Sequence, residues 1–253
     1  MTIEADLFLP VGYRENPPQS ADSAGAPYWG DPTENDVRYQ VPVYRYAQRR
    51  TRQLRAETIL DVGSGSGDKL AEFFGALRGV RIVGADQPSG VEIARQRFRD
   101  LEWVSGDFES PDFWQELRQI SPDIIICADV IEHLEDPIQF LDRLRAISAN
   151  GRLIMSTPDR GKLGSAPLGP PANPRHVREW TMQELAQLVE ANGFRIVTQK
   201  SLLPRRYTVS RTEFNRVAWR LLHGQAVPDP RSCQLLELVV AEESPDAGPS
   251  RRS

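Results

Sequence analysis

The sequence has few cysteines, no long apolar run and no strong excess of one charge. Cys127 and Cys233 are the only cysteines, and their separation fits no metal-binding motif. Cys127 falls within a strand pattern, which predicts a reduced thiol in the core. No stretch approaches the roughly 20 apolar residues of a membrane span. Residues 1–10 carry acids but no basic region typical of a signal peptide. We therefore expect a cytoplasmic protein without a membrane partner.

The composition changes along the chain and divides it into three parts. Residues 1–36 are rich in proline, glycine, serine and acids without a sustained period, which predicts a flexible N-terminal arm. Its aromatic side chains, among them Tyr13 and Trp29, would either cover a ligand or be exposed. Residues 37–242 carry the periodic patterns of one α/β domain with a single core. Residues 243–253 are polar and predict a disordered tail.

A glycine-rich turn at residues 59–68 is the most informative stretch. A short apolar run contains Asp61, and Gly63, Gly65 and Gly67 follow at alternate positions, directly before a helical pattern. Glycine is needed where the backbone takes a positive φ or where a ligand lies against it. The stretch predicts a strand, a tight turn that binds a ligand, and the beginning of a helix.

The spacing of the glycines in this turn distinguishes two classes of ligand. A dinucleotide site requires Gly-x-Gly-x-x-Gly or Ala, but the sixth position counted from Gly63 is Asp68, which is too large for close helix–strand packing. This disfavours an NAD-dependent oxidoreductase. Asp61-x-Gly63-x-Gly65-x-Gly67 instead resembles the first motif of class I S-adenosylmethionine (SAM) methyltransferases. SAM carries an ammonium and a sulfonium, which suit nearby carboxylates.

Strand and helix patterns alternate along the domain. The predicted strands are at 58–62, 81–85, 101–104, 123–127, 152–156, 194–198 and 235–241. This alternation predicts a Rossmann-like, doubly wound α/β sheet. The resemblance implies seven strands, of which the last is antiparallel. Ligands of such sheets bind beyond the carboxyl ends of the strands, beside the first strand.

Helix boundaries follow from capping signals. Pro42 predicts the first turn of a helix at 42–55, and Asp136 is expected to cap a helix at 138–147. Two stretches have the capping-box pattern, 89–92 and 181–184. The helix that begins at the second of these is expected to end at Asn192 and Gly193.

Several acids follow predicted strands and are therefore expected at one edge of the sheet. Asp86, which Gln87 follows, can accept both ribose hydroxyls of an adenosine, or it is a solvated turn acid. Asp107 can accept the adenine amino group, with Phe108 against the ring, or it caps the following turn. Asp129 follows the buried fourth strand. Their convergence predicts a nucleoside site.

The loop after the fourth strand makes the resemblance more specific. Glu132-His133-x-x-Asp136-Pro137 is similar to the element Glu-His-x-x-Asp-Pro of ubiquinone-biosynthesis O-methyltransferases and many small-molecule methyltransferases. With the first motif, the resemblance covers about residues 56–200. It implies that SAM is the cofactor, that S-adenosylhomocysteine is the product, and that the backbone at Asp129 lies beside the methionine moiety. The cofactor residues so identified are Asp61, Gly63, Gly65, Gly67, Asp86, Gln87, Asp107, Phe108 and Asp129.

Two histidines are candidates for catalysis. An imidazole titrates near neutral pH, so His133 can act as a general base toward a methyl acceptor oxygen, or it can be structural. His176, Trp180 and Thr181 match a second element of the family, which lies after the fifth strand. His176 would then bind the acceptor, or it would order its loop. Glu132 and His133 show no distinctive metal spacing, so no metal is expected.

The sequence as a whole predicts a SAM-dependent methyltransferase that methylates an oxygen of a small molecule or a sugar-bearing metabolite. Two alternatives remain. A protein or RNA methyltransferase would recognise its partner through the arginine-rich segment 204–220, which includes part of a predicted helix at 210–222. A non-catalytic partner subunit would bind SAM only. The formal net charge of −4 disfavours a nucleic-acid partner, and a homo-oligomer is compatible with the sequence.

Overall fold

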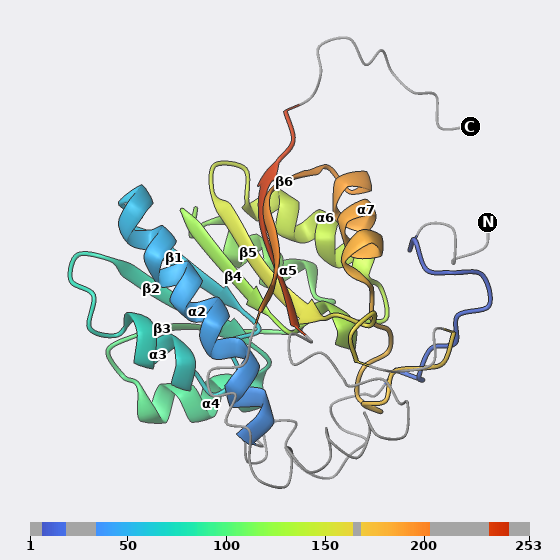
Figure 1. The fold of residues 1–253 in the computed structure, drawn as a ribbon. Helices are drawn as coiled ribbons and strands as arrows, with labels where there is room; N and C mark the ends of the chain where they lie inside the picture. Colours follow the sequence, from blue (N-terminus) through green and yellow to red (C-terminus); the bar gives the residue numbers. More distant parts are fainter. Residues whose placement is uncertain (1–6, 19–33, 164–167, 203–232, 243–253) are drawn as a thin grey trace, which may run out of the picture.

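The computed structural model describes residues 7–18, 34–163, 168–202 and 233–242 (Figure 1). Its centre is a seven-stranded sheet with the order β3-β2-β1-β4-β5-β7-β6. The strands are β1 (Thr58–Val62), β2 (Arg81–Asp86), β3 (Glu102–Ser105), β4 (Ile124–Ala128), β5 (Arg152–Pro158), β6 (Phe194–Leu202) and β7 (Cys233–Val240). The pairs among β1 to β5 are parallel, and β7 is antiparallel to both β5 and β6. The predicted Rossmann-like sheet with an antiparallel last strand is confirmed.

Helices cover both faces of the sheet (Figure 1). On one face lie α2 (Glu34–Leu54), α3 (Asp68–Phe74) and α4 (Pro88–Arg97); on the other lie α5 (Pro111–Arg118), α6 (Pro137–Ile147) and α7 (Met182–Ala191). Each face of the sheet packs a hydrophobic core against its helices, and strand residues alternate between these two cores. Ile59 belongs to the core beneath α2, α3 and α4, whereas Leu60 and Val62 belong to the core beneath α5, α6 and α7. Each such fully buried side chain contributes about 1.5–3 kcal/mol to folding. None of the described helices is long and apolar enough to cross a membrane.

Two predicted helix starts are wrong. Helix α2 begins at Glu34 and runs through Pro42, although proline removes one helical hydrogen bond. The neighbouring Val41 and Val43 are completely buried, and their packing offsets this loss. Helix α4 begins at Pro88 with Gln87 as its N-cap, so the expected capping box at 89–92 does not form. The fixed φ of proline suits the first helical position.

Other predicted ends of helices and strands agree more closely with the structure. Asp136 caps α6 through its side chain, and the capping box at 181–184 is present in full. Strands β5 and β6 extend beyond their predicted ends because each pairs with β7 over its length. The predicted helix at 210–222 lies outside the described residues, as does the whole arginine-rich segment.

Residues 7–18 pack against the domain, which corrects the expectation of a flexible arm for this stretch. Leu7, Leu9 and Tyr13 are buried, and they belong to the same core cluster as α5, α6 and α7. The indole of Trp180 donates a hydrogen bond to the carbonyl of Leu7. Apolar side chains without helical or strand periodicity gave no sign of this packing, because their partners are distant in sequence.

Candidate functional site

The glycine turn connects β1 to α3 in a backbone conformation that suits glycine. Gly63, Gly65 and Gly67 have φ values of 83°, 59° and 77°. A Cβ on Gly67 would lie 2.3 Å from the indole of Trp103. The amides of this turn are already used within the protein. Gly63 and Ser64 donate to the carbonyl of the β2 residue that precedes Asp86, and Gly67 donates to Ser64. The amides of Gly63, Ser64 and Gly67 are therefore not available to a ligand.

Asp61 lies beneath this turn on the α2 face of the sheet. Its side chain is completely buried, and the hydroxyl of Tyr44 in α2 donates a hydrogen bond of 2.7 Å to Oδ2. The other oxygen, Oδ1, is buried without a hydrogen-bond partner. Burial raises the pKa of Asp61 to about 7, against the effect of the Tyr44 hydrogen bond. Such a carboxylate is suited to a cationic partner.

Asp86 closes the turn from the end of β2. Its two oxygens accept 2.7 Å hydrogen bonds from the amides of Gly65 and Gln87. Burial raises its pKa to about 6, although these two amides act in the opposite direction. Each carboxylate oxygen has a second lone pair, so both can still accept a hydroxyl.

Asp107 and Phe108 lie after β3, where predicted. Asp107 is exposed, and its Oδ1 accepts a hydrogen bond of 2.9 Å from the amide of Glu109, as a turn cap does. Phe108 is half-buried and packs edge-on against Phe113 and Phe140. Both residues therefore have structural contacts of their own, and Phe108 is held in a fixed position by its neighbours.

Asp129 has a left-handed backbone, with φ of 55°, directly after β4. Such a conformation is strained in a residue other than glycine, and it is frequent at functional sites. The hydroxyl of Ser156 donates a 2.7 Å hydrogen bond to Oδ1, and the Ser156 carbonyl accepts from the Asp129 amide. Burial raises the pKa of Asp129, and the side chain of Gln40 also bonds to it.

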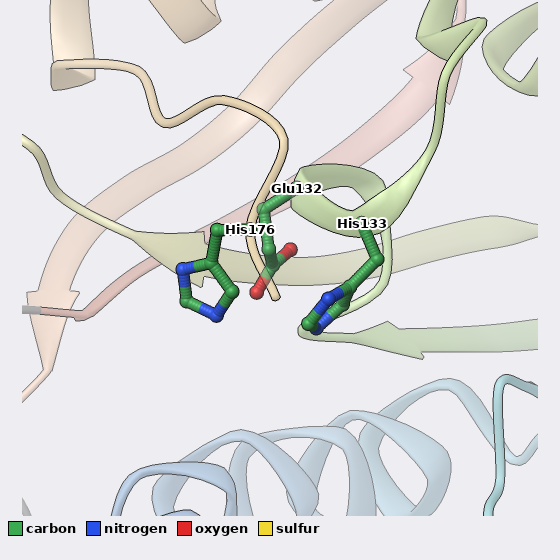
Figure 2. A group of neighbouring side chains, drawn as sticks. All are labelled: Glu132, His133 and His176. Carbon is green, nitrogen blue, oxygen red and sulfur yellow. The ribbon is translucent and has the colours of Figure 1, made fainter. Parts of the chain in front are cut away.

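Glu132, His133 and His176 converge on one point (Figure 2). Glu132 and His133 come from the short 3₁₀ helix η1 (Ile131–His133), and His176 comes from the loop between β5 and α7. The imidazole centroids are 4.8 Å apart, with an angle of 82° between the ring planes. The carboxylate of Glu132 lies between the two rings (Figure 2), completely buried. The structure thus brings both predicted histidines into one cluster.

Hydrogen bonds fix the orientation of each ring. Nδ1 of His133 is 2.9 Å from the carbonyl oxygen of Arg175, and Nδ1 of His176 is 2.5 Å from Oε1 of Glu179. Both partners are acceptors, so each Nδ1 carries a proton, and Nε2 is the nitrogen of each ring that can offer a lone pair. Burial lowers the pKa of His133 to about 4, and the neighbouring His176 acts in the same direction.

The N-terminal segment holds the loop that carries His176. The side-chain amide of Asn16 donates to three carbonyls of this loop, those of Pro171, Asn173 and His176. The hydroxyl of Tyr13 accepts a hydrogen bond from the amide of Glu179. The sequence indicated Tyr13 as a possible cover for a ligand, whereas Asn16 carried no recognisable signal.

Buried polar atoms without a partner gather at this edge of the sheet. In the described part of the chain, four buried side-chain oxygens lack a hydrogen-bond partner. They are Asp61 Oδ1, Ser64 Oγ, Glu132 Oε1 and Glu179 Oε2. Two flank the glycine turn and two belong to the histidine cluster. Since buried polar groups are nearly always paired, this concentration indicates a binding site with two halves.

Three of the residues that form the site escaped the sequence analysis. Tyr44, Ser156 and Glu179 bond to the predicted residues Asp61, Asp129 and His176. Glu179 follows His176 by three positions, a spacing that could have suggested the pair. Tyr44 and Ser156 are residues of an ordinary helix and strand, and only the tertiary structure reveals them.

Comparison with known proteins gives the family. Residues 37–199 match the model of a methyltransferase domain. A SAM-dependent methyltransferase of Mycobacterium tuberculosis is 30% identical over 192 residues, which are 71% of this chain and 66% of that protein. The ubiquinone biosynthesis O-methyltransferase of Nitrobacter winogradskyi is 30% identical over 157 residues, 57% of this chain and 59% of that protein. The matches therefore span less than two thirds of these relatives.

Solved structures agree on the fold. A methyltransferase in complex with the Haloferax volcanii Trm112 activator aligns with a TM-score of 0.55 at 19% identity, covering 78% of this chain and 90% of that one. The plantazolicin methyltransferase BamL, solved with S-adenosylhomocysteine and a substrate analogue, also gives 0.55 at 13% identity, covering 80% and 85%. This chain belongs to the class I SAM-dependent methyltransferase family. The predicted family, whose members use SAM as their cofactor, is confirmed.

Proposed function

We propose that this protein transfers the methyl group of SAM to a hydroxyl oxygen of a small molecule. The observation that carries the proposal is the set of unpartnered buried oxygens in two adjoining groups, one at the glycine turn and one at the histidine pair. The first suits a cationic cofactor and the second suits an acceptor that must lose a proton. The O-methyltransferase relatives support oxygen as the methylated atom.

The glycine turn forms the cofactor half in this proposal. Oδ1 of Asp61 accepts a hydrogen bond from the ammonium of SAM, and Asp129 contributes a second negative charge beside it. Asp86 accepts the two ribose hydroxyls through its remaining lone pairs, and Gln87 borders the ribose. Asp107 and Phe108 border the adenine. When bound, SAM supplies an electrophilic methyl carbon attached to a sulfonium.

The histidine cluster forms the acceptor half. Nε2 of His176 accepts the hydroxyl proton of the acceptor, while Glu179 holds Nδ1–H and stabilises the imidazolium that results. The acceptor oxygen forms the new C–O bond as the C–S bond breaks, and the electron pair stays on sulfur. His133, whose ring centroid is 4.8 Å from that of His176, provides a second acceptor for a proton or hydroxyl through Nε2. Much of the acceleration comes from positioning the two reactants.

Calorimetry and a transfer assay test this function together. We expect SAM and S-adenosylhomocysteine to bind with dissociation constants in the micromolar range, about −8 kcal/mol. SAM labelled in its methyl group is then incubated with the protein and a panel of phenols, catechols and sugars, and label in the organic product is counted. Absence of SAM binding would refute the proposal. SAM binding without transfer to any hydroxyl, but with transfer to RNA or protein, would favour the alternative acceptors.

SAM affinity should depend on pH through Asp61. The pKa of Asp61 in the free protein is raised to about 7, so its carboxyl is neutral at low pH. This neutral form stabilises the free protein, and the stabilisation is lost as the pH rises through 7. The SAM ammonium requires the ionised form and displaces the proton. Affinity should therefore increase by about tenfold from pH 5.5 to pH 7.0, below the range in which an α-amino group itself titrates.

The proton linkage is measurable directly. Calorimetry at pH 6.5 in phosphate and in Bis-Tris, which have different ionisation enthalpies, gives the number of protons that binding releases. The matched variant Asp61→Asn should bind more weakly and lose most of the pH dependence. Equal affinity of the wild type at both pH values would contradict the assigned role of Asp61.

Glu179 is expected to act as a positioning residue for His176. The variant Glu179→Gln keeps the volume but removes the charge that holds Nδ1–H, so kcat for the acceptor found above should fall by about tenfold. The affinity for SAM should remain within about twofold, because Glu179 belongs to the other half of the site. An equal loss in kcat and in SAM affinity would instead indicate a general structural role.

A further inference from the structure

The cluster in Figure 2 has the composition of a metal site. One ligand atom each from Glu132, His133 and His176 lies within 4.8 Å of the other two. Two imidazoles and one carboxylate are a ligand set of catalytic zinc sites. Ligands at about 2.0–2.1 Å from a tetrahedral ion lie about 3.4 Å apart, so a modest contraction of the cluster completes the geometry.

The nitrogens are oriented as metal ligands are. A histidine that binds a metal usually donates its other N–H to a carbonyl or a carboxylate, which fixes the ring. His133 has such a partner in the carbonyl of Arg175, and His176 has one in Glu179. In both rings this arrangement leaves the lone pair on Nε2. The Nε2 of His176 accepts from the side-chain amide of Asn173 at 2.8 Å, and Asn173 is exposed, so it can move aside.

The buried carboxylates of the cluster are an independent indication that a cation binds there. Glu132 is completely buried, and its Oε2 accepts from the hydroxyl of Thr157 while its Oε1 has no partner. Glu179 is 2% exposed, and its Oε2 is likewise buried without a partner. Buried carboxylate oxygens without a partner are costly, and a nearby cation removes this cost. Figure 2 shows the Glu132 carboxylate directed between the two rings.

We propose that Glu132, His133 and His176 bind one divalent transition-metal cation of the zinc class. Two nitrogen ligands disfavour magnesium and calcium, which prefer oxygen. The sequence gave no expectation of this site because Glu132 and His133 are adjacent, whereas His176 comes from a distant loop. Three protein ligands leave at least one coordination position for a further ligand.

The role of the cation deepens the proposed function and rests on it. A hydroxyl that coordinates a divalent cation becomes a stronger acid. With the cation bound, Nε2 of His176 would be a ligand and the cation would take over its part in activating the acceptor. The acceptor hydroxyl would lose its proton to water on coordination, and its oxygen would attack the methyl carbon as the C–S bond breaks. The metal site itself can be tested without any acceptor.

Metal binding is tested on the full chain after treatment with EDTA and dialysis. Titration with Zn²⁺ by calorimetry should give one ion per chain with a dissociation constant below about 1 μM. Co²⁺, added in place of Zn²⁺, should give the visible absorption of a site with nitrogen and oxygen ligands. Absence of stoichiometric binding of both ions would overturn the proposal.

Variants identify the ligands. Glu132→Gln and His133→Gln should each weaken Zn²⁺ binding by at least tenfold, whereas Glu135→Gln, at an exposed neighbouring acid, should leave it unchanged. SAM affinity measured on the same samples reports whether each variant is folded. His176→Asn is the second variant if Glu132→Gln is unfolded. SAM binding without metal binding would overturn the metal site alone; metal binding without SAM binding would refute the proposed function alone.

Discussion

The variant Asp86→Ala is expected to weaken SAM binding by about 100-fold, the cost of two charge-assisted hydrogen bonds of about 1.5 kcal/mol each. Asp86 is proposed to accept both ribose hydroxyls. It also accepts the amides of Gly65 and Gln87, so its loss loosens the turn as well. Calorimetry of SAM and of S-adenosylhomocysteine should give similar ratios, since the two ligands share the ribose.

Two controls separate this effect from a general loss of structure. Asp142→Ala removes an exposed acid of α6 that pairs with Arg145, and SAM affinity should stay within twofold. Asp86→Asn keeps the size and one acceptor oxygen, so its affinity should be intermediate. If Asp86→Ala binds SAM as tightly as the wild type while its melting temperature is unchanged, the ribose role of Asp86 is wrong.

The variant Gly67→Ala is expected to lower the free energy of unfolding by about 3 kcal/mol. An alanine at φ of 77° costs about 1–2 kcal/mol, and the Cβ, 2.3 Å from the Trp103 ring, adds the typical 1–3 kcal/mol of overpacking. Trp103 cannot move easily, because it is buried and its indole N–H donates to the carbonyl of Phe98. The melting temperature should fall by roughly 6–12 °C.

Gly79→Ala is the matched control for this prediction. Gly79 has φ of 73°, but a Cβ there would meet nothing within 4 Å. It should therefore lose only the backbone contribution of about 1–2 kcal/mol. Thermal unfolding of both variants isolates the collision with Trp103. Equal destabilisation of the two would show that the indole moves aside and that the turn tolerates a side chain.

The sequence predicts the sheet well where local pattern and local structure coincide. Strand β1 has the predicted ends, because a β-branched run is limited by a glutamate before it and a glycine turn after it. The antiparallel direction of β7 came from the family resemblance. Its place between β5 and β6 is seen only in the structure, since no local pattern encodes strand order. Helix α2 was predicted too short because Pro42 is a normal first-turn residue, and only burial against the sheet shows that the helix continues.

The residues of the candidate site also divide into those that the sequence predicted and those that it did not. Asp61 lies one residue before the end of β1, Asp86 ends β2 and Asp129 follows β4, so parallel topology brings them to one edge. The partners of these acids could not be predicted, because Tyr44 reaches Asp61 from helix α2 and Ser156 reaches Asp129 from the neighbouring strand β5. The proposed metal ligand set likewise could not be predicted, because the loop of His176 meets η1 only in three dimensions.

The attachment of Asn16 to the loop of His176 has a consequence for the order of assembly. These hydrogen bonds join residues 155 to 160 positions apart, while the contact of Asp86 with Gly65 joins residues 21 apart. During synthesis at about 5–20 residues per second, the N-terminal segment therefore waits roughly ten seconds or more for its partners to emerge. The proposed nucleoside-binding half can therefore take shape while the ribosome is still working, before the loop that carries His176 has emerged.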